Sequence, residues 1–361
     1  MFRRFLLILV LLFSLFVLNA FLNPIPKKNS PLGFKVSYGV SYSFEQAQWY
    51  GLDGRDAFVE LLDTTRFDWV RLPFFWDEMV DKKGRLKLED LEVAILEAKK
   101  RNVKVVIALG AKVPYYPEYH LPRSIKNQLK FGETIGLDHP IAAEILEIDK
   151  KVVRELSKYD NISHWQVENE PFLANVNNWK IDESLLSAEI EVVRENDPKM
   201  RPVILNHVGP AVFDKRYKSL LSLLLPGDVF GVNAYFKTQG VYLMAFRIFG
   251  KEVKIDWPRF LVWPVQSWSG FSPNFSNLKK ESEKRGVDFW ILEVQSEPYI
   301  RALDDAKRNQ SYFTAGDIEA ASTFLNSFRI NSMGLWGAHF WQYRARIGDK
   351  SWEGSVKKLI N

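Results

Sequence analysis

The sequence contains no cysteine, so disulfide bonds, thiol catalysis and lipid attachment through cysteine are all excluded. An excess of charge is also lacking, because 49 basic residues face 44 acidic ones for a net charge of +5. The basic residues form no long run, whereas a nucleic-acid-binding domain usually carries a basic patch or stripe. We therefore expect no nucleic-acid partner.

Several catalytic signatures are missing as well. No Gly-rich phosphate loop follows any predicted strand, which argues against a dinucleotide-binding fold. No His-Glu-x-x-His or paired-histidine motif indicates a metal site. The five histidines are scattered and no Gly-x-Ser-x-Gly elbow is present, so nothing indicates a Ser-His-Asp triad. We expect neither a metal nor an organic cofactor.

Long apolar runs are confined to the N-terminus. Arg3 and Arg4 precede residues 5–22, which are apolar except for Ser14 and Asn19. This pattern is typical of a signal peptide or a signal anchor. Residues 1–30 are therefore expected to be a signal or anchor with a short linker, and residues 31–361 a single catalytic domain. That domain would be a monomer, either secreted or tethered through residues 5–22 to the outer face of the cell membrane.

From residue 34 onward the pattern alternates between strand and helix. Eight segments read as strands, the number that closes a (β/α)8 (TIM) barrel: 34–42, 69–75, 104–109, 163–170, 202–206, 229–235, 289–294 and 334–341. Apolar residues at helical spacing lie between them, as in Ile141, Ile145, Ile148, Val152 and Leu156. The fold class expected is α/β, with a parallel barrel favoured over an open sheet.

One connection is unusually long. Residues 239–272 follow the sixth predicted strand and contain Phe246, Phe249, Trp257, Phe260, Trp263 and Trp268 with little helical period. Long loops without secondary structure of their own are usually functional or disordered, and this one is too aromatic to be disordered. We interpret it as an ordered flap over the strand ends, with a membrane-touching loop as the alternative.

Two predicted strands end in a glutamate. Residues 165–171 read Trp-Gln-Val-Glu-Asn-Glu-Pro, and Pro171 forbids further regular pairing, which places Glu170 at the carboxyl end of its strand. Glu293 closes the apolar run that begins at Phe289. Parallel barrels place their chemistry at these ends, and two carboxylates there are the minimum for retaining glycoside hydrolysis.

Two other glutamates compete for these roles. Glu168 shares a strand face with Glu170 but would lie one strand period deeper, where it would need a basic partner such as Arg71. Glu297 lies beyond the strand end and reads as a loop acid or a supporting residue. The structural alternative for Glu170 and Glu293 themselves is that both are solvated loop acids.

These two segments resemble the fourth- and seventh-strand signatures of the clan A glycoside hydrolases, and of cellulase-like, family five type enzymes in particular. Further motifs extend the similarity from about residue 34 to the end: Val-Arg-Leu-Pro at 70–73, Trp-Asp-Glu at 76–78, Pro117-Glu118, Asn233-Ala234-Tyr235, and the segment from Trp336 to Trp341. The resemblance implies a (β/α)8 glycosidase with Glu170 as acid/base and Glu293 as nucleophile.

The resemblance also implies supporting roles. Asn169 would bond the sugar 2-hydroxyl, Arg71 would orient the nucleophile, Tyr235 would give it a hydroxyl partner, and Trp341 would be the platform under the reacting sugar. Trp76 and His120 are further substrate-binding candidates.

The sequence departs from the family pattern in two places. Asn233 stands where a His is common two residues before the strand-six Tyr, and Gly110 and Lys112 lie where another His is common at the end of strand three. His120 and His339 are candidates to compensate, although a lone His is more often a packed or surface residue.

The sequence thus predicts a retaining glycosidase that acts on an oligosaccharide, polysaccharide or glycoconjugate, most simply at a β-linkage. A transglycosidase would use the same intermediate but exclude water. A catalytically silent carbohydrate-binding barrel at the cell surface is the alternative from a different class. Product analysis with an added acceptor sugar separates the first two, and turnover of any glycoside separates them from the third.

Overall fold

The computed structural model describes residues 33–174, 176–209, 214–239, 242–248, 251–256, 262–263, 274–298, 300, 302–308 and 312–360, with residues 8, 10, 11, 14 and 25 before them. Most of residues 1–30, and with them most of the expected signal or anchor, lie outside the described residues. Among the residues that are described, no helix is both long and apolar enough to cross a membrane.

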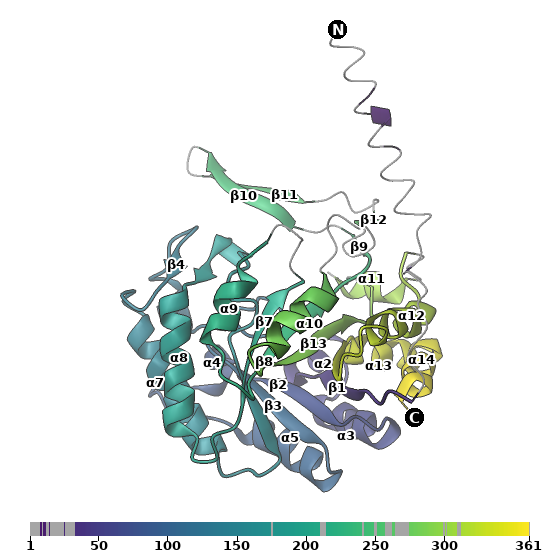
Figure 1. Cartoon of the computed structure of the whole chain (residues 1–361), viewed down its shortest axis with the longest axis horizontal. Coiled ribbons are helices and arrows are strands. Elements are labelled where there is room, and N and C mark those ends of the chain that lie inside the picture. The colour runs from purple at the N-terminus through teal and green to yellow at the C-terminus, as the bar shows by residue number, and fades with distance from the viewer. Residues whose placement is uncertain are drawn as a thin grey trace.

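A closed barrel of eight parallel strands forms the centre of the molecule (Figure 1). Its strands, in order around the barrel from β1, are β1 (Ser37–Ser41), β2 (Trp69–Pro73), β3 (Lys104–Leu109), β5 (Ile162–Val167), β7 (Val203–Val208), β8 (Val229–Ala234), β13 (Asp288–Gln295) and β14 (Ser332–Trp336). β1 pairs with β14 through Ser37 and Ser332, which closes the ring. The predicted (β/α)8 barrel is confirmed, with every strand at its expected place along the chain.

Helices cover the outside of the barrel (Figure 1). The helices of the described residues are α2 (Phe44–Trp49), α3 (Gly54–Thr64), α4 (Trp76–Met79), α5 (Glu89–Lys100), α6 (Arg123–Lys126), α7 (Ala142–Leu156), the 3-10 helix η1 (Val176–Asn178), α8 (Glu183–Asn196), α9 (Tyr217–Leu223), α10 (Phe275–Glu283), α11 (Leu303–Lys307), α12 (Ala315–Asn326), α13 (Ala338–Arg346) and α14 (Ser351–Ile360). The short α4, α6 and η1 lie in connections that follow the carboxyl ends of β2, β3 and β5. On α7 the predicted face, including Ile145, Ile148 and Val152, is buried against the barrel. Side-chain caps fix several starts, as where Asp53 accepts the first N–H groups of α3.

Three small sheets lie in the connections at the carboxyl ends of the strands. They pair β4 (Thr134–Ile135) with β6 (Lys180–Ile181), β9 (Thr238–Gln239) with β12 (Val262–Trp263), and β10 (Tyr242–Ile248) with β11 (Lys251–Asp256). The β10–β11 hairpin extends beyond the end of the barrel, at the top of Figure 1. The expectation that residues 239–272 lack secondary structure is therefore wrong for their described part.

Two strands end earlier than the sequence pattern predicts. β5 stops at Val167, because Glu168 and Glu170 both adopt left-handed backbone conformations with φ of 58° and 47°. β14 stops at Trp336, because Gly337 has φ of 139°, and the chain then enters α13. Trp341 is consequently on a helix and not on the eighth strand.

Candidate active site

Glu293 lies on β13 and is held from two sides. The Arg71 guanidinium on β2 donates to its Oε1 at 2.7 Å, and the Tyr235 hydroxyl donates to its Oε2 at 2.7 Å. Arg71 is itself fully buried. Both partners stabilise the negative charge of the carboxylate and leave it one fixed orientation.

Arg71 is fixed by its other contacts. Its Nε donates to the Ser41 hydroxyl at 2.8 Å, and its Nη1 donates to the Gln166 side chain at 3.3 Å. Its guanidinium carbon also lies 5.8 Å from the ring centre of Trp336. The family resemblance implied that Arg71 and Tyr235 lie beside Glu293, and the structure places both there.

Glu170 follows β5 and is buried. Its Oε1 accepts a hydrogen bond from the Asn233 amide at 2.7 Å, and its backbone N–H donates to the Asn206 side chain at 2.9 Å. Burial raises the pKa of Glu170 to about 8, with the Lys112 cation lowering it and the Glu293 charge raising it. Glu170 is therefore mainly protonated near neutral pH.

Asn233 connects the two acids. On β8 it lies in register with Glu293 on β13, and its amide reaches across to Glu170. The structure thus brings together, at the carboxyl ends of the fourth and seventh barrel strands, a carboxyl whose pKa burial raises to about 8 and a carboxylate paired with an arginine. Acid-assisted displacement at a sugar carbon requires one neutral and one ionised acid.

Three amide side chains support this pair. The Asn169 Oδ1 accepts from Asn206 at 3.0 Å and from Gln166 at 3.4 Å. Because both bonds use the amide oxygen, the NH2 group is what Asn169 can offer to a sugar hydroxyl. Gln166 and Asn206 were not among the predicted site residues, although their place on β5 and β7 near the strand ends could have indicated them.

The expectation that Glu168 shares a face with Glu170 is wrong, and Arg71, named as an example of the basic partner that Glu168 would need, pairs with Glu293 instead. The left-handed backbone of Glu168 turns its side chain toward the end of β3, where it accepts the N–H groups of Ala111 at 2.6 Å and Lys112 at 2.7 Å. Behind it lie Asp149 on α7 and Glu189 on α8, both fully buried. Burial raises the pKa of Glu168 to about 7, and burial together with mutual repulsion raises those of Asp149 and Glu189 well above their usual range.

The sugar platform expected at Trp341 is a second correction. Trp341 is 1% exposed and donates its indole N–H to the Ser296 carbonyl at 2.7 Å, so it has no open face. Trp336, at the end of β14, is half-buried and stacks on Tyr115 with ring centres 4.5 Å apart. Of the two tryptophans, Trp336 has the position and the exposure that a platform needs.

Glu297 lies next to this aromatic wall. Burial raises its pKa to about 8, with a hydrogen bond from the Trp336 side chain lowering it. The negative charge of Glu297 also raises the pKa values of Tyr50, Tyr115 and Tyr235. Glu297 is therefore a third carboxyl of the site and not a solvated loop acid.

His120 and Trp76 lie farther around the strand ends. His120 stacks on Phe75 with ring centres 3.7 Å apart, and its Nδ1 is 3.3 Å from the Asp77 carboxylate. Trp76 is buried in the hydrophobic core, so its expected role in contacting substrate is not supported. His339 is also buried and packs against Tyr42, which agrees with a packed histidine.

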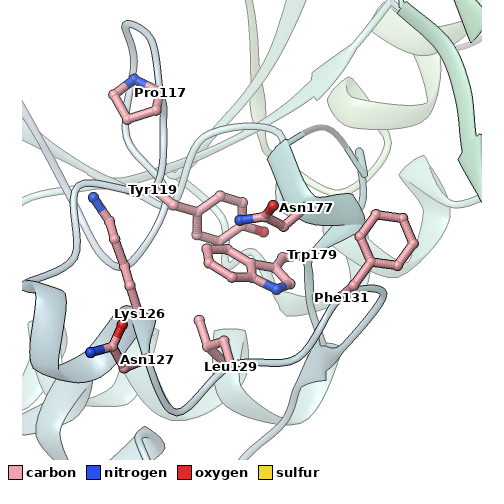
Figure 2. Close-up of a pocket in the computed structure, with 8 residues that line it drawn as sticks. All are labelled: Pro117, Tyr119, Lys126, Asn127, Leu129, Phe131, Asn177 and Trp179. Carbon is pink, nitrogen blue, oxygen red and sulfur yellow. The ribbon is translucent and has the colours of Figure 1, made fainter. Parts of the chain in front are cut away.

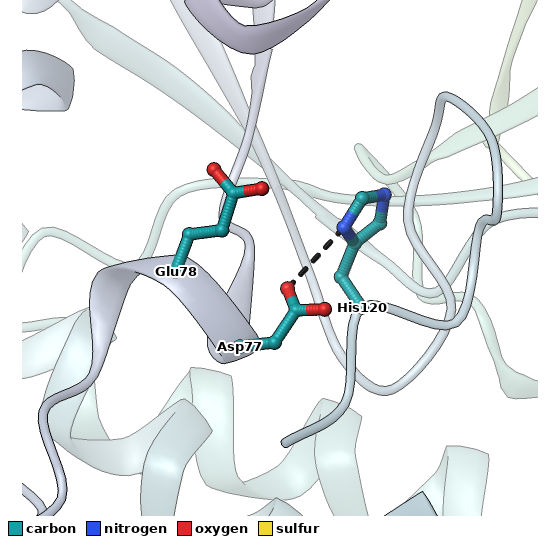
Figure 3. A group of neighbouring side chains, drawn as sticks. All are labelled: Asp77, Glu78 and His120. Atoms are coloured by element: carbon teal, nitrogen blue, oxygen red, sulfur yellow. Dashed lines mark ion pairs between the residues drawn. The ribbon is translucent and has the colours of Figure 1, made fainter. Parts of the chain in front are cut away.

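One group in the described part of the chain has the composition of a metal site. Asp77, Glu78 and His120 each offer a ligand atom within 4.8 Å of the others (Figure 3). The Lys126 ammonium lies 3.2 Å from Asp77, however, and already balances its charge. No observation on these residues requires a cation.

A pocket of about 360 Å3 opens between the segments that follow β3 and β5 (Figure 2). Its lining includes the rings of Tyr119, Phe131 and Trp179 and the amides of Asn127 and Asn177. Tyr119 and Trp179 are nearly fully buried, so the Phe131 ring and the two amides are the groups that are open to the C–H faces and hydroxyls of a sugar. Both segments follow the carboxyl ends of their strands, so the pocket lies on the rim of the barrel that carries Glu170.

The barrel and its paired carboxyls define the protein as a clan A glycoside hydrolase. Residues 30–244, well over half of the chain, match the family described as cellulase, glycosyl hydrolase family 5. The chain belongs to this family. It is a glycosidase.

Solved structures agree on the fold. A GH5_18 protein of Streptomyces cattleya, in complex with GlcNAc, is 12% identical, with a TM-score of 0.57 over 84% of this chain and 70% of that one. A GH5-4 broad specificity endoglucanase from an uncultured bovine rumen ciliate is 12% identical, with a TM-score of 0.56 over 91% and 94%. A family 5 enzyme of Prevotella bryantii B14, in complex with a xyloglucan tetradecasaccharide, is 11% identical, with a TM-score of 0.52 over 91% and 94%. No curated protein sequence matches the chain.

Proposed function

We propose that this protein is a retaining glycosidase that cleaves a β-linked oligosaccharide, polysaccharide or glycoconjugate. In the first step a Glu293 oxygen attacks the anomeric carbon while Glu170 gives its proton to the departing glycosidic oxygen. In the second step Glu170, now ionised, takes a proton from water, and the water oxygen displaces Glu293 from the sugar. The observation that carries the proposal is the contrast between the surroundings of the two acids: Glu293 is paired with Arg71 and Tyr235, whereas burial raises the pKa of Glu170 to about 8.

An extended substrate is favoured over a single sugar with a small leaving group. The pocket between the β3 and β5 connections offers the Phe131 ring and the amides of Asn127 and Asn177 on the rim that bears Glu170. Two of the similar structures are described as an endoglucanase and as a xyloglucan complex, which supports the same class of substrate. We also propose that the domain is exported, as a monomer, through its N-terminal apolar segment.

The test is a screen of the domain against aryl glycosides, oligosaccharides of increasing length and polysaccharides. Proton NMR of the first product anomer then reports stereochemistry: a β-product from a β-substrate is expected, and an α-product would contradict retention. A chain-length series should show kcat/KM rising with added sugars. Transfer of the sugar to an added acceptor in place of hydrolysis would identify a transglycosidase. The absence of turnover on every glycoside would favour a catalytically silent carbohydrate-binding barrel.

A further inference from the structure

Two turns at the strand ends lie against each other. One consists of residues 110–112 after β3, and the other of residues 168–170 after β5. The Glu168 N–H donates to the Leu109 carbonyl at 2.9 Å, and the Asn169 N–H donates to the Lys112 carbonyl at 2.6 Å. Backbone pairing thus continues from the strands into the turn that carries Glu170.

Side chains join the same two turns in both directions. The Glu168 carboxylate accepts the backbone N–H groups of Ala111 and Lys112. The Lys112 ammonium, in return, donates to the carbonyls of Glu170 at 2.8 Å and Leu173 at 3.1 Å. We refer to this reciprocal arrangement of Glu168 and Lys112 as the clasp.

The clasp is closely built. The Lys112 side chain is fully buried, and its third contact is the Glu118 carboxylate at 3.1 Å. Gly110 has φ of 114°, and a Cβ atom there would lie 2.5 Å from the Glu168 Oε1. Glycine is therefore required beside the clasp, both for its backbone angle and for the close approach of the carboxylate.

The turn needs such support because it is strained. Glu168 and Glu170 both have positive φ, a conformation that costs a non-glycine residue on the order of 1–2 kcal/mol. Residues persist in it only where the surroundings fix them. Without its contacts the turn would be expected to relax, and the Glu170 carboxyl would lose its direction.

We propose that Lys112 is a positioning residue for the acid/base, holding the backbone of Glu170 so that its carboxyl points at the glycosidic oxygen. The inference rests on the proposed function, in which Glu170 is the proton donor. The Lys112 ammonium is buried among the carbonyls of Glu170 and Leu173 and the Glu118 carboxylate, so no contact with substrate is assigned to it. It acts through the carbonyl of Glu170, in a region where cellulase-like enzymes commonly place a histidine.

Lys112 also acts on the charge of Glu170. The ionisable groups around this carboxyl are Glu293 on β13, Tyr235 after β8, Glu118 in the β3 connection and Lys112 itself, with His207 of β7 near Lys112. Glu293 and Glu118 raise the pKa of Glu170, and Lys112 lowers it. Removal of the Lys112 charge should therefore raise this pKa and extend activity to higher pH.

The experiment compares K112M with R201M on a series of aryl glycosides whose leaving groups differ in basicity. Arg201 is a matched control, because it is buried, donates to the carbonyls of Ser157 and Tyr159, and pairs with Asp197. It precedes β7 and so lies at the opposite end of the barrel. Thermal unfolding and a kcat/KM pH profile are recorded for each protein.

K112M should lose about 10- to 100-fold in kcat/KM on poor leaving groups and less than about threefold on activated ones, because a misdirected acid matters only where protonation is needed. Its alkaline limb should move up by about one pH unit. R201M should lower the unfolding temperature but change neither the dependence of kcat/KM on the leaving group nor its dependence on pH. A uniform loss in K112M across the series, with an unmoved alkaline limb, would overturn the proposal.

A second variant covers the case in which K112M does not fold. E168Q keeps the size of the side chain but replaces one acceptor oxygen by a donor facing the N–H groups of Ala111 and Lys112. It should steepen the leaving-group dependence in the same direction, and an unchanged dependence would refute the clasp. Inactivity of the unmodified protein on every glycoside would instead refute the proposed function.

Discussion

The pH dependence of the first catalytic step follows from the surroundings of Glu170. Burial and the nearby Glu293 charge raise the pKa of Glu170 from its usual 4.5 to about 8, against the opposing effect of Lys112. This change corresponds to about 5 kcal/mol in favour of the neutral form. Glu170 would then be about 90% protonated at pH 7 and about 10% protonated at pH 9.

Formation of the glycosyl-enzyme requires the protonated form of Glu170. The value of kcat/KM on an unactivated glycoside should therefore fall about tenfold per pH unit above pH 8. Glu297 complicates the assignment, because burial raises its pKa to about 8 as well. The assay is therefore a kcat/KM profile from pH 5 to 10 for the unmodified protein, E170A and E297Q.

The two variants separate the two carboxyls. E297Q should keep the alkaline limb of the kcat/KM profile, because that limb reports the ionisation of the proton donor, Glu170. E170A, assayed on an activated aryl glycoside that needs little proton assistance, should lose it. An alkaline limb that persists in E170A, or disappears in E297Q, would show that Glu170 is not the acid.

Three further predictions concern stability, the long connection and export. The buried acids Glu168, Glu189 and Asp149 have raised pKa values, so their contribution to stability is present at low pH and is lost as pH rises from the usual carboxyl range through about 7 and above. The free energy of unfolding should fall on the order of 3 kcal/mol between pH 5 and 8.5 from Glu168 alone, and E189Q should reduce this fall where the exposed control E191Q does not. If residues 239–272 form a flap over the sugar, W263A or W268A should lower kcat/KM about threefold to tenfold with little change in unfolding temperature; normal kinetics with lost membrane association would identify an anchor. A protein beginning at Ser30 should be soluble, folded and monomeric by size-exclusion chromatography with light scattering, and aggregation of this form beside a detergent-stable full chain would contradict the assigned linker.

Much of the barrel could be predicted because its strands are apolar runs of the right length, separated by segments with helical periodicity. Glu293 could be predicted with it because it closes an apolar run of strand length, whereas Arg71 and Tyr235 were expected beside it only because their motifs resemble those of cellulase-like enzymes. Regular strand geometry then fixes the direction of the side chain.

The parts that could not be predicted depend on departures from regular geometry. Alternation along a strand puts Glu168 and Glu170 on one face, but the positive φ at both residues separates them. Gly337 ends β14 and moves Trp341 onto a helix, and an apolar run gives no sign of such a stop. The burial of Lys112 depends on carbonyls about sixty positions away, which no local pattern reports.

The identity of the nucleophile is the central claim, and covalent trapping tests it directly. A 2-fluoro-sugar with an activated leaving group slows the second step, so the glycosyl-enzyme accumulates and the labelled peptide can be found by mass spectrometry. The label is predicted on Glu293, whose carboxylate is fixed by Arg71 and Tyr235. A label on Glu297 or Glu170, or turnover of the reagent by E293A at the rate of the unmodified protein, would contradict the assignment.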